Sequence, residues 1–128
     1  MRRFEKQYEV KVSEQLLYEA LTNQSKVSQW SGAPAVMSEE EGARFSLWGG
    51  SIEGVNKIVT RHTLIQQWKE KSWENYSNVS FEWKQGPSSL VISLVHTAIP
   101  DNSYDNIKRG WDEHYMNPLI TWLESNNL

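Results

Sequence analysis

The sequence predicts an α+β domain in which seven antiparallel strands wrap around a long C-terminal helix, with two short helices after the first strand. Three observations predict this class. Apolar and polar residues alternate in short segments separated by turn residues, as in a sheet covered on one face. Large apolar residues recur at helical spacing near the C-terminus. The first strand pattern is followed by two helical patterns rather than by a hairpin.

The first strand is expected from Phe4 to Val12, where apolar even positions alternate with polar odd ones and only Lys6 breaks the pattern. Ser13 suits the N-cap of a helix, and Asn23 suits the N-cap of a second short helix that ends near Trp30. Since almost no loop separates the two helices, we expect them to meet at an angle.

Turn residues divide the next part of the chain into six further strands, expected at Ala35–Ser38, Ala43–Trp48, Ser51–Val59, Thr63–Trp73, Asn78–Gln85 and Ser88–Thr97. Val79, Phe81 and Trp83 alternate with polar neighbours, which indicates one apolar and one wet face. Gly49 and Gly50 can take positive φ angles, and they predict a two-residue hairpin turn.

The long helix is expected from about Asn102 to Glu124. About 20 residues rise roughly 30 Å, which is enough to cross a sheet. Pro118 should leave a kink or mark a late boundary. Only the sheet is large enough to cover the apolar stripe of this helix, which contains Ile107, Trp111, Tyr115, Leu119 and Trp122.

Composition excludes several classes of function. The 128 residues contain no cysteine, so disulfides, thiolate catalysis and cysteine-ligated metals are excluded. The net charge is −3 and the basic residues are scattered, which gives nucleic-acid binding little support. No apolar run approaches the ~20 residues of a membrane span, and the N-terminus does not read as a signal peptide. We therefore expect a cytoplasmic protein in which residues 1–128 form one domain.

Seven tryptophans stand out in a chain of this length. Tryptophan favours cores and pocket walls, because it buries a large apolar area and its N–H needs a partner. A curved sheet covered by one helix can leave an apolar cavity of ~300–1,000 Å³, which is a common small-molecule site. Unless they simply fill the core, the following residues are expected to line it: Trp30, Phe45, Leu47, Trp68, Phe81, Trp83, Trp111 and Tyr115. Leu47 and its neighbour Trp48 are both apolar, so a one-residue bulge would exchange them.

The ionisable residues suggest no catalytic or metal-binding group. His62 belongs to a turn and His114 lies opposite the apolar stripe, so both suit an exposed surface, whereas the role of His96 stays open. The run 112–114 diverges by about 100° per residue on a helix and cannot face one point. We expect no catalytic residue, no metal and no cofactor. The acidic run 39–41 is most simply a solvated turn, with a contact patch for a basic partner as the alternative.

Several motifs, taken in order, carry a resemblance that covers essentially the whole chain: Trp30-Ser-Gly, the segment 45–54 (FSLWGGSIEG), Ile65-Gln-Gln-Trp68, and the helix segment from Gly110 to Leu119. Each is weak alone, but together they are specific. The chain resembles the family typified by the C-terminal domain of the activator of heat-shock protein 90 ATPase. This family belongs to the SRPBCC superfamily, which includes the START lipid-transfer domains. The resemblance implies the helix-grip fold. The turn 60–62 departs from the pattern, since a proline is expected there.

The resemblance implies functions of different classes. The first is a non-enzymatic module that binds a hydrophobic or amphipathic small molecule between sheet and helix. The second is a co-chaperone, a protein-interaction module that acts on a heat-shock protein 90 homologue in the stress response. A third, a cyclase- or hydrolase-like enzyme, is disfavoured because no acid–base pair converges. Eukaryotic activators carry a separate N-terminal domain that contributes to engaging the chaperone, so we expect small-molecule binding to rank first for this single domain.

Overall fold

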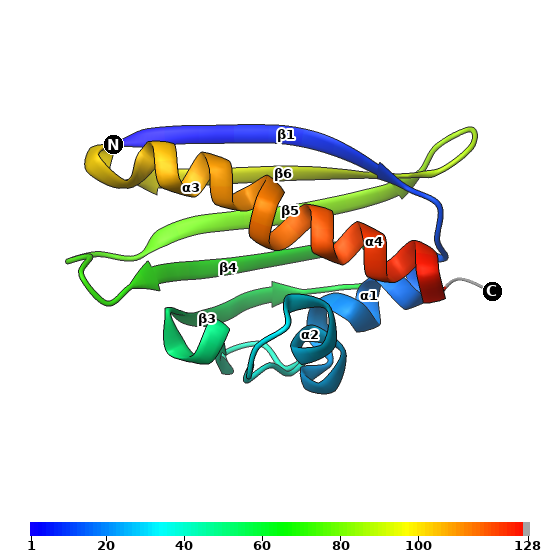
Figure 1. Cartoon of the computed structure of the whole chain (residues 1–128), viewed down its shortest axis with the longest axis horizontal. Helices are drawn as coiled ribbons and strands as arrows, with labels where there is room; N and C mark the ends of the chain where they lie inside the picture. The colour runs from blue at the N-terminus through cyan, green and yellow to red at the C-terminus, as the bar shows by residue number, and fades with distance from the viewer. Residues whose placement is uncertain (127–128) are drawn as a thin grey trace.

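The computed structural model describes residues 1–126 and shows an α+β domain of two layers (Figure 1). One layer is an antiparallel sheet with the strand order β1-β6-β5-β4-β3-β2. Its strands are β1 (Arg2–Val10), β2 (Arg44–Leu47), β3 (Ile52–Val59), β4 (Thr63–Glu70), β5 (Ser77–Gln85) and β6 (Leu90–Ile99).

Helices form the second layer. The C-terminal helical run, residues 101–126, crosses the sheet diagonally (Figure 1). The two short helices α1 (Glu14–Thr22) and α2 (Gln24–Ser31) lie near its C-terminal end (Figure 1). None of the helices formed by residues 1–126 is both long enough and apolar enough to cross a membrane. The helical elements are α1 (Glu14–Thr22), α2 (Gln24–Ser31), η1 (Trp48–Gly50), η2 (Asp101–Ser103), α3 (Tyr104–Gly110), η3 (Trp111–Met116) and α4 (Asn117–Asn126).

The sheet has six strands, so the prediction of seven is wrong at Ala35–Ser38. This segment makes one isolated bridge, between Val36 and Ser46 of β2. Val36 and Ser46 exchange both of their backbone bonds, so the next bonds of an antiparallel ladder would come from residues 34 and 38. Pro34 has no N–H, and the Ser38 carbonyl accepts from Asn56 Nδ2 at 2.9 Å, so the ladder does not extend. The N–H groups of residues 35 and 37 point away from β2 and bond to side chains of α2, at 3.2 Å from Ser28 Oγ and 3.2 Å from Gln24 Oε1.

The turn between β2 and β3 also differs from the predicted two-residue hairpin. The last strand pair is Leu47 with Ile52, so residues 48–51 form the connection. Positive φ angles occur at Gly49 (67°) and Gly50 (99°) as expected, but also at Trp48 (51°). A bulky residue with positive φ is strained, and the surrounding structure must hold it there. This conformation sets the position of the Trp48 side chain.

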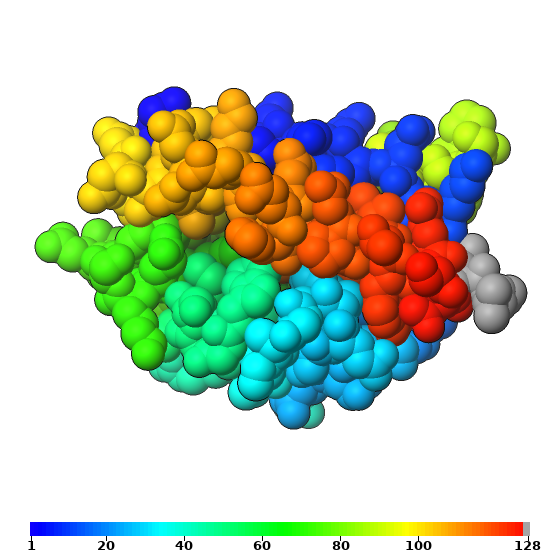
Figure 2. Space-filling view, viewed as in Figure 1, coloured from blue at the N-terminus to red at the C-terminus, as the bar shows by residue number. Residues whose placement is uncertain are grey.

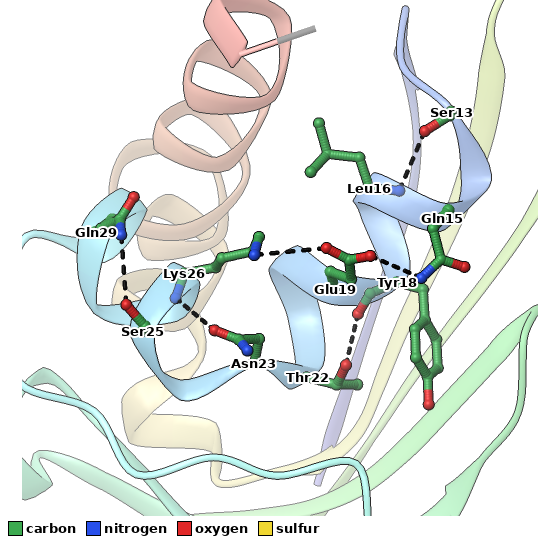
Figure 3. Close-up of polar contacts among 10 residues, drawn as sticks. All are labelled: Ser13, Gln15, Leu16, Tyr18, Glu19, Thr22, Asn23, Ser25, Lys26 and Gln29. Atoms are coloured by element: carbon green, nitrogen blue, oxygen red, sulfur yellow. Dashed lines mark hydrogen bonds and ion pairs between the residues drawn. The ribbon is translucent and has the colours of Figure 1, made fainter.

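The two predicted N-caps are confirmed (Figure 3). Ser13 Oγ accepts a hydrogen bond of 3.2 Å from the Leu16 N–H at the start of α1. Asn23 Oδ1 accepts one of 3.0 Å from the Lys26 N–H at the start of α2. The two helices are also joined by an ion pair, in which Lys26 Nζ lies 3.5 Å from Glu19 Oε1. Together these contacts fix the bend between α1 and α2.

The C-terminal helix changes pitch in its middle, just before the predicted boundary at Pro118. In η3 the turns are π-helical, and the Asn117 N–H bonds to the carbonyl of Asp112, five residues earlier. Proline has no N–H, and its ring crowds the carbonyl four residues before it in a regular helix. A widened turn next to Pro118 accommodates both effects. Within η3, Trp111 and Tyr115 are buried against the sheet.

Gly54 allows the sheet to pack tightly beside its short edge strand. It pairs with Phe45 of β2 across the ladder. A Cβ atom at Gly54 would lie 1.9 Å from the carbonyl oxygen of Gln67 and 2.6 Å from the Phe45 ring. Since real Cβ atoms do not approach backbone so closely, only glycine fits here. The ring of Phe45 thereby fills the space above the Gly54 backbone.

Candidate functional site

A pocket of about 350 Å³ opens between the C-terminal helical run and one end of the sheet. In Figure 2 the orange atoms of α3 and η3 lie over the green and teal atoms from β4, β3 and η1 on this side of the molecule. The volume lies at the lower end of the range for small-molecule sites. The pocket is lined by Trp48, Ser51, Ile52, Trp68, Glu70, Asn106, Ile107, Gly110, Trp111, His114 and Tyr115.

Four aromatic rings from three elements form one wall of the pocket. The rings of Trp68 and Trp111 are stacked, with centroids 4.7 Å apart and an interplanar angle of 27°. Tyr115 lies 4.8 Å from Trp111, and Trp48 meets Tyr115 edge-on at 6.2 Å. Offset-stacked and edge-to-face geometries at these distances are favourable for aromatic pairs. The wall is therefore a packed aromatic cluster rather than separate exposed rings.

Trp111 is held in place by a buried hydrogen-bonded chain. Its Nε1–H donates to His96 Nδ1 at 3.0 Å, and His96 Nε2 lies 2.7 Å from Ser77 Oγ. Ser77 Oγ donates to the Trp68 carbonyl at 2.9 Å. Since an indole N–H can only donate, His96 carries its proton on Nε2 and donates it to Ser77. Burial lowers the pKa of His96 to about 3, so this imidazole stays neutral.

A second buried chain holds Trp68. The Trp68 Nε1–H donates to Gln66 Oε1 at 2.8 Å, and Gln66 Nε2 donates to Asn56 Oδ1 at 2.8 Å. Asn56 Nδ2 then donates to the Ser38 carbonyl at 2.9 Å. Both indole N–H groups of the stacked pair are thus used inside the protein. The rings of Trp68 and Trp111 offer the pocket carbon surface and no hydrogen-bond donor.

The polar groups of the pocket are few. The Tyr115 hydroxyl makes no hydrogen bond with any residue of the described range, and burial raises its pKa, so it stays protonated. The Glu70 carboxylate, at the end of β4, likewise has no hydrogen bond or ion pair within residues 1–126, and burial raises its pKa. Ser51 Oγ donates to the Trp48 carbonyl. The lining also contains the Trp48 indole, the Asn106 amide and the exposed His114 imidazole, so Glu70 is its acidic group.

Three of the eight residues predicted to line a cavity, namely Trp68, Trp111 and Tyr115, line this pocket. Trp30 does not: its Nε1–H donates to the Ala20 carbonyl at 2.8 Å, and it borders a separate pocket between α2 and α4. The remaining four predicted residues are buried in the core and do not line the pocket: Phe45, Leu47, Phe81 and Trp83.

The position of the helix explains why the pocket lies at one end of the sheet. Phe81 stacks with Tyr115 at 5.5 Å and meets Trp111 edge-on at 5.8 Å, so the helical run packs directly on the middle of the sheet. Trp48, the alternative to Leu47 in the sequence, lines the pocket in place of Leu47. Sequence reasoning did not identify the other lining residues, and nothing in the pattern distinguishes Glu70.

The other histidines lie at the surface. His62 Nδ1 is 3.7 Å from Glu14 Oε1 on an exposed part of the molecule, and His114 is exposed at the rim of the pocket. Within residues 1–126, no group of three or more His, Asp or Glu side chains is placed to hold a metal ion. The absence of a catalytic residue and of a cofactor stays a prediction.

The sequence matches one family over most of its length. The family model described as "Activator of Hsp90 ATPase homolog 1-like protein" matches residues 11–124. An "Activator of 90 kDa heat shock protein ATPase homolog" of Dictyostelium discoideum is 28% identical over 107 residues, which is 80% of this chain and 28% of that protein. The "homolog 2" of Mus musculus is 27% identical over 111 residues, covering 84% of this chain and 34% of its own. The chain thus spans about a third of the length of these relatives.

Solved structures share the fold. An HSP90 activator from Plasmodium falciparum has a TM-score of 0.86 to this chain at 27% identity, and 96% of each chain is covered. A protein from Mesorhizobium loti has a TM-score of 0.84 at 20% identity, with 99% of this chain and 100% of that chain covered. The arrangement of one curved sheet and a C-terminal helical run is therefore common to all three.

Proposed function

Because the chain belongs to the family of activator of Hsp90 ATPase homolog 1-like proteins, we propose that it is a non-enzymatic helix-grip module that binds a hydrophobic or amphipathic small molecule. The observation that carries the proposal is the pocket of about 350 Å³ with an aromatic wall between sheet and helix. A cytoplasmic location, which the sequence predicts, is part of the same proposal.

The chemistry of the wall favours an apolar ligand. Because the N–H groups of Trp68 and Trp111 are already bonded inside the protein, covering these rings leaves no donor unpaired. Burial of apolar surface contributes about 25 cal/mol per Å². The unused Tyr115 hydroxyl can orient a ligand through a single hydrogen bond. An amphipathic molecule satisfies both features.

The non-enzymatic part of the proposal is supported by the ionisable groups. Glu70 and His114 both line the pocket, but no hydrogen bond or ion pair joins them. His96 is fully buried, and both of its ring nitrogens are engaged. General acid–base catalysis needs such groups to converge on one reacting atom. This arrangement disfavours the cyclase- or hydrolase-like alternative.

A ligand screen with a pocket-filling variant tests the proposal. At least one class in a panel of fatty acids, sterols and flavonoids should change tryptophan fluorescence, and a ligand at a hundredfold excess over its Kd should raise Tm by about 10 °C. Gly110 lines the pocket, and a Cβ there meets only His114 at 3.8 Å, an ordinary contact. The variant Gly110→Leu should therefore fold, as circular dichroism would show, and lose the response. An unchanged Tm of the wild-type protein across the whole panel would reject small-molecule binding.

A second candidate function is action on a heat-shock protein 90 homologue. It is favoured by the names of the matched relatives, which are described as activators of that ATPase. The acidic turn is held in place by two of its carboxylates: Glu39 accepts a bond from the Tyr18 hydroxyl, and Glu41 accepts one from the Val59 N–H. A turn held in this way supports the proposed contact surface. Glu40 is exposed, and its carboxylate takes part in neither bond.

The second candidate is tested with the chaperone itself. Co-elution with a heat-shock protein 90 homologue and a rise in its ATP turnover are expected, and both should weaken at higher salt. Glu40→Gln should reduce the effect without loss of stability, since its carboxylate makes no contact that holds the turn. ATPase stimulation combined with a flat ligand screen would place this function first.

A further inference from the structure

We infer that the pocket selects an organic cation, an ammonium group carried on a flat apolar body, with Glu70 as its counter-ion. This inference rests on the proposed small-molecule function and names the ligand class of the same pocket. Three observations carry it: an unpaired carboxylate, a wall of aromatic rings, and a set of described lining residues that includes no lysine or arginine.

The first observation is the unpaired carboxylate. Glu70 lies opposite Ile52 of β3 at the end of the sheet, and both side chains line the pocket. Its sequence neighbours Lys69 and Lys71 make no ion pair with it, and nothing else in the described range does. A half-buried carboxylate without a partner loses hydration and gains no compensating charge. A bound cation supplies that charge.

The second observation is the aromatic wall. Trp48, Trp68, Trp111 and Tyr115 lie within a cluster whose neighbouring centroids are 4.7 to 6.2 Å apart. A cation within about 6 Å of a tryptophan face is attracted by the ring quadrupole, and aromatic cages are a recurring way to bind ammonium groups. Because the two stacked indoles donate their N–H groups elsewhere, neither of these donors opposes an ammonium at that part of the wall.

The third observation concerns anions. A carboxylate ligand finds no lysine or arginine among the described lining residues. The Arg109 guanidinium reaches Asn106 Oδ1 at 2.7 Å, but Arg109 itself does not line the pocket. The imidazole of His114 also lines the pocket, but it lies at the exposed rim and not in the interior. The interior of the pocket therefore favours a positive or neutral ligand over a negative one.

Three probes that share one ring system test this charge preference. They are 1-naphthylmethylammonium, the neutral 1-naphthylmethanol and the anionic 1-naphthoate, titrated by calorimetry at low ionic strength. The ammonium should bind the wild-type protein about tenfold more tightly than the alcohol, equivalent to about 1.4 kcal/mol. Glu70→Gln should remove most of this preference, leave the part that the aromatic rings contribute, and leave the Kd of the alcohol unchanged. Glu82→Gln, an exposed carboxylate of β5 outside the pocket, should keep it.

The possible outcomes separate this inference from the proposed function. Equal affinity for ammonium and alcohol, or a preference that Glu70→Gln does not reduce, overturns the cation inference while small-molecule binding stands. Binding of the fatty acids, sterols or flavonoids without binding of the ammonium likewise overturns the cation inference and supports small-molecule binding. If neither set of ligands binds, both proposals fail. A clearly reduced ammonium preference in Glu70→Gln, with no reduction in Glu82→Gln, confirms the inference.

Discussion

The Trp111 Nε1–H donates to His96 Nδ1 at 3.0 Å, which ties the C-terminal helical run to strand β6 through one buried hydrogen bond. The acceptor nitrogen must be unprotonated for this bond to exist. Protonation of His96 would place two N–H donors face to face in a buried site. The attachment of the helix to the sheet therefore depends on a neutral imidazole.

Stability should fall as the pH drops because of His96. Folding lowers its pKa from 6.5 to about 3, since burial disfavours the imidazolium. The unfolded chain then binds more protons than the folded one, so the free energy of unfolding decreases as the pH falls through 6.5 toward 3. We expect a loss of about 2 kcal/mol from this residue between pH 7.5 and pH 5, measured by urea unfolding at each pH.

His96→Gln is the control for this effect. Glutamine keeps a donor and an acceptor but does not titrate. Between pH 7.5 and pH 5 the free energy of unfolding of the variant should therefore fall by about 2 kcal/mol less than that of the wild-type protein. The difference between the two proteins removes the contributions of other groups. Parallel curves for the two proteins would show that His96 is not the titrating group.

Trp111→Ala should be strongly destabilising. The side chain is 2% exposed and stacks on Trp68, so its removal leaves a large cavity and also an unpaired His96 nitrogen. Large-to-small changes of this type cost about 3–5 kcal/mol. Trp122→Ala, at a half-buried position on α4, should cost clearly less. Equal losses in urea unfolding would contradict the structural role assigned to Trp111.

Two glycines should respond in opposite ways to alanine. Gly54→Ala places a Cβ 1.9 Å from a backbone oxygen, so we expect a loss of about 3 kcal/mol or failure to fold. Gly110→Ala meets only an ordinary contact inside a helical segment, and it should gain about 0.5–1 kcal/mol. Thermal unfolding of both variants measures the contrast. A stable Gly54→Ala protein would refute the close approach at that position.

Gln66→Leu should reveal the cost of breaking the second buried chain. The change leaves the Trp68 Nε1–H and the side-chain Oδ1 of Asn56 unpaired at positions closed to solvent. Each orphaned group costs about 1–3 kcal/mol, so we expect a loss of about 2–4 kcal/mol in urea unfolding. Gln67→Leu, on the opposite face of the same strand, should change stability little. Equal losses of stability in the two variants would argue against the buried hydrogen-bonded chain through Gln66.

Local patterns predicted most of the fold. Strand β5 was expected from Asn78 and begins at Ser77, because its alternation of apolar and polar residues is regular. The caps at Ser13 and Asn23 depend on residues only three positions apart. The false seventh strand shows where local reasoning ends. The Ser38 carbonyl, which a longer ladder would need, accepts from Asn56 Nδ2 of β3, a contact that only the tertiary structure reveals.

The candidate site was predicted only in part, for a related reason. Trp68 and Trp111 could be identified because each is the large apolar residue of its motif and faces the other layer. Whether Phe81 borders a cavity depends on where the helix lies along the sheet, and Tyr115 in fact covers it. Glu70 gives no signal in the sequence, since its importance comes from lacking a partner in three dimensions.

The π-helical turns of η3 amount to one residue more than a regular helix would use over the same length. An extra residue rotates the downstream part of the helix by about 100° about its axis. The half that borders the pocket and the half that anchors Leu119 and Leu123 in the core are therefore offset in phase. Substitutions in α3 can reshape the pocket without changing which face α4 buries, so the shape of the pocket can change separately from the packing that keeps the domain folded.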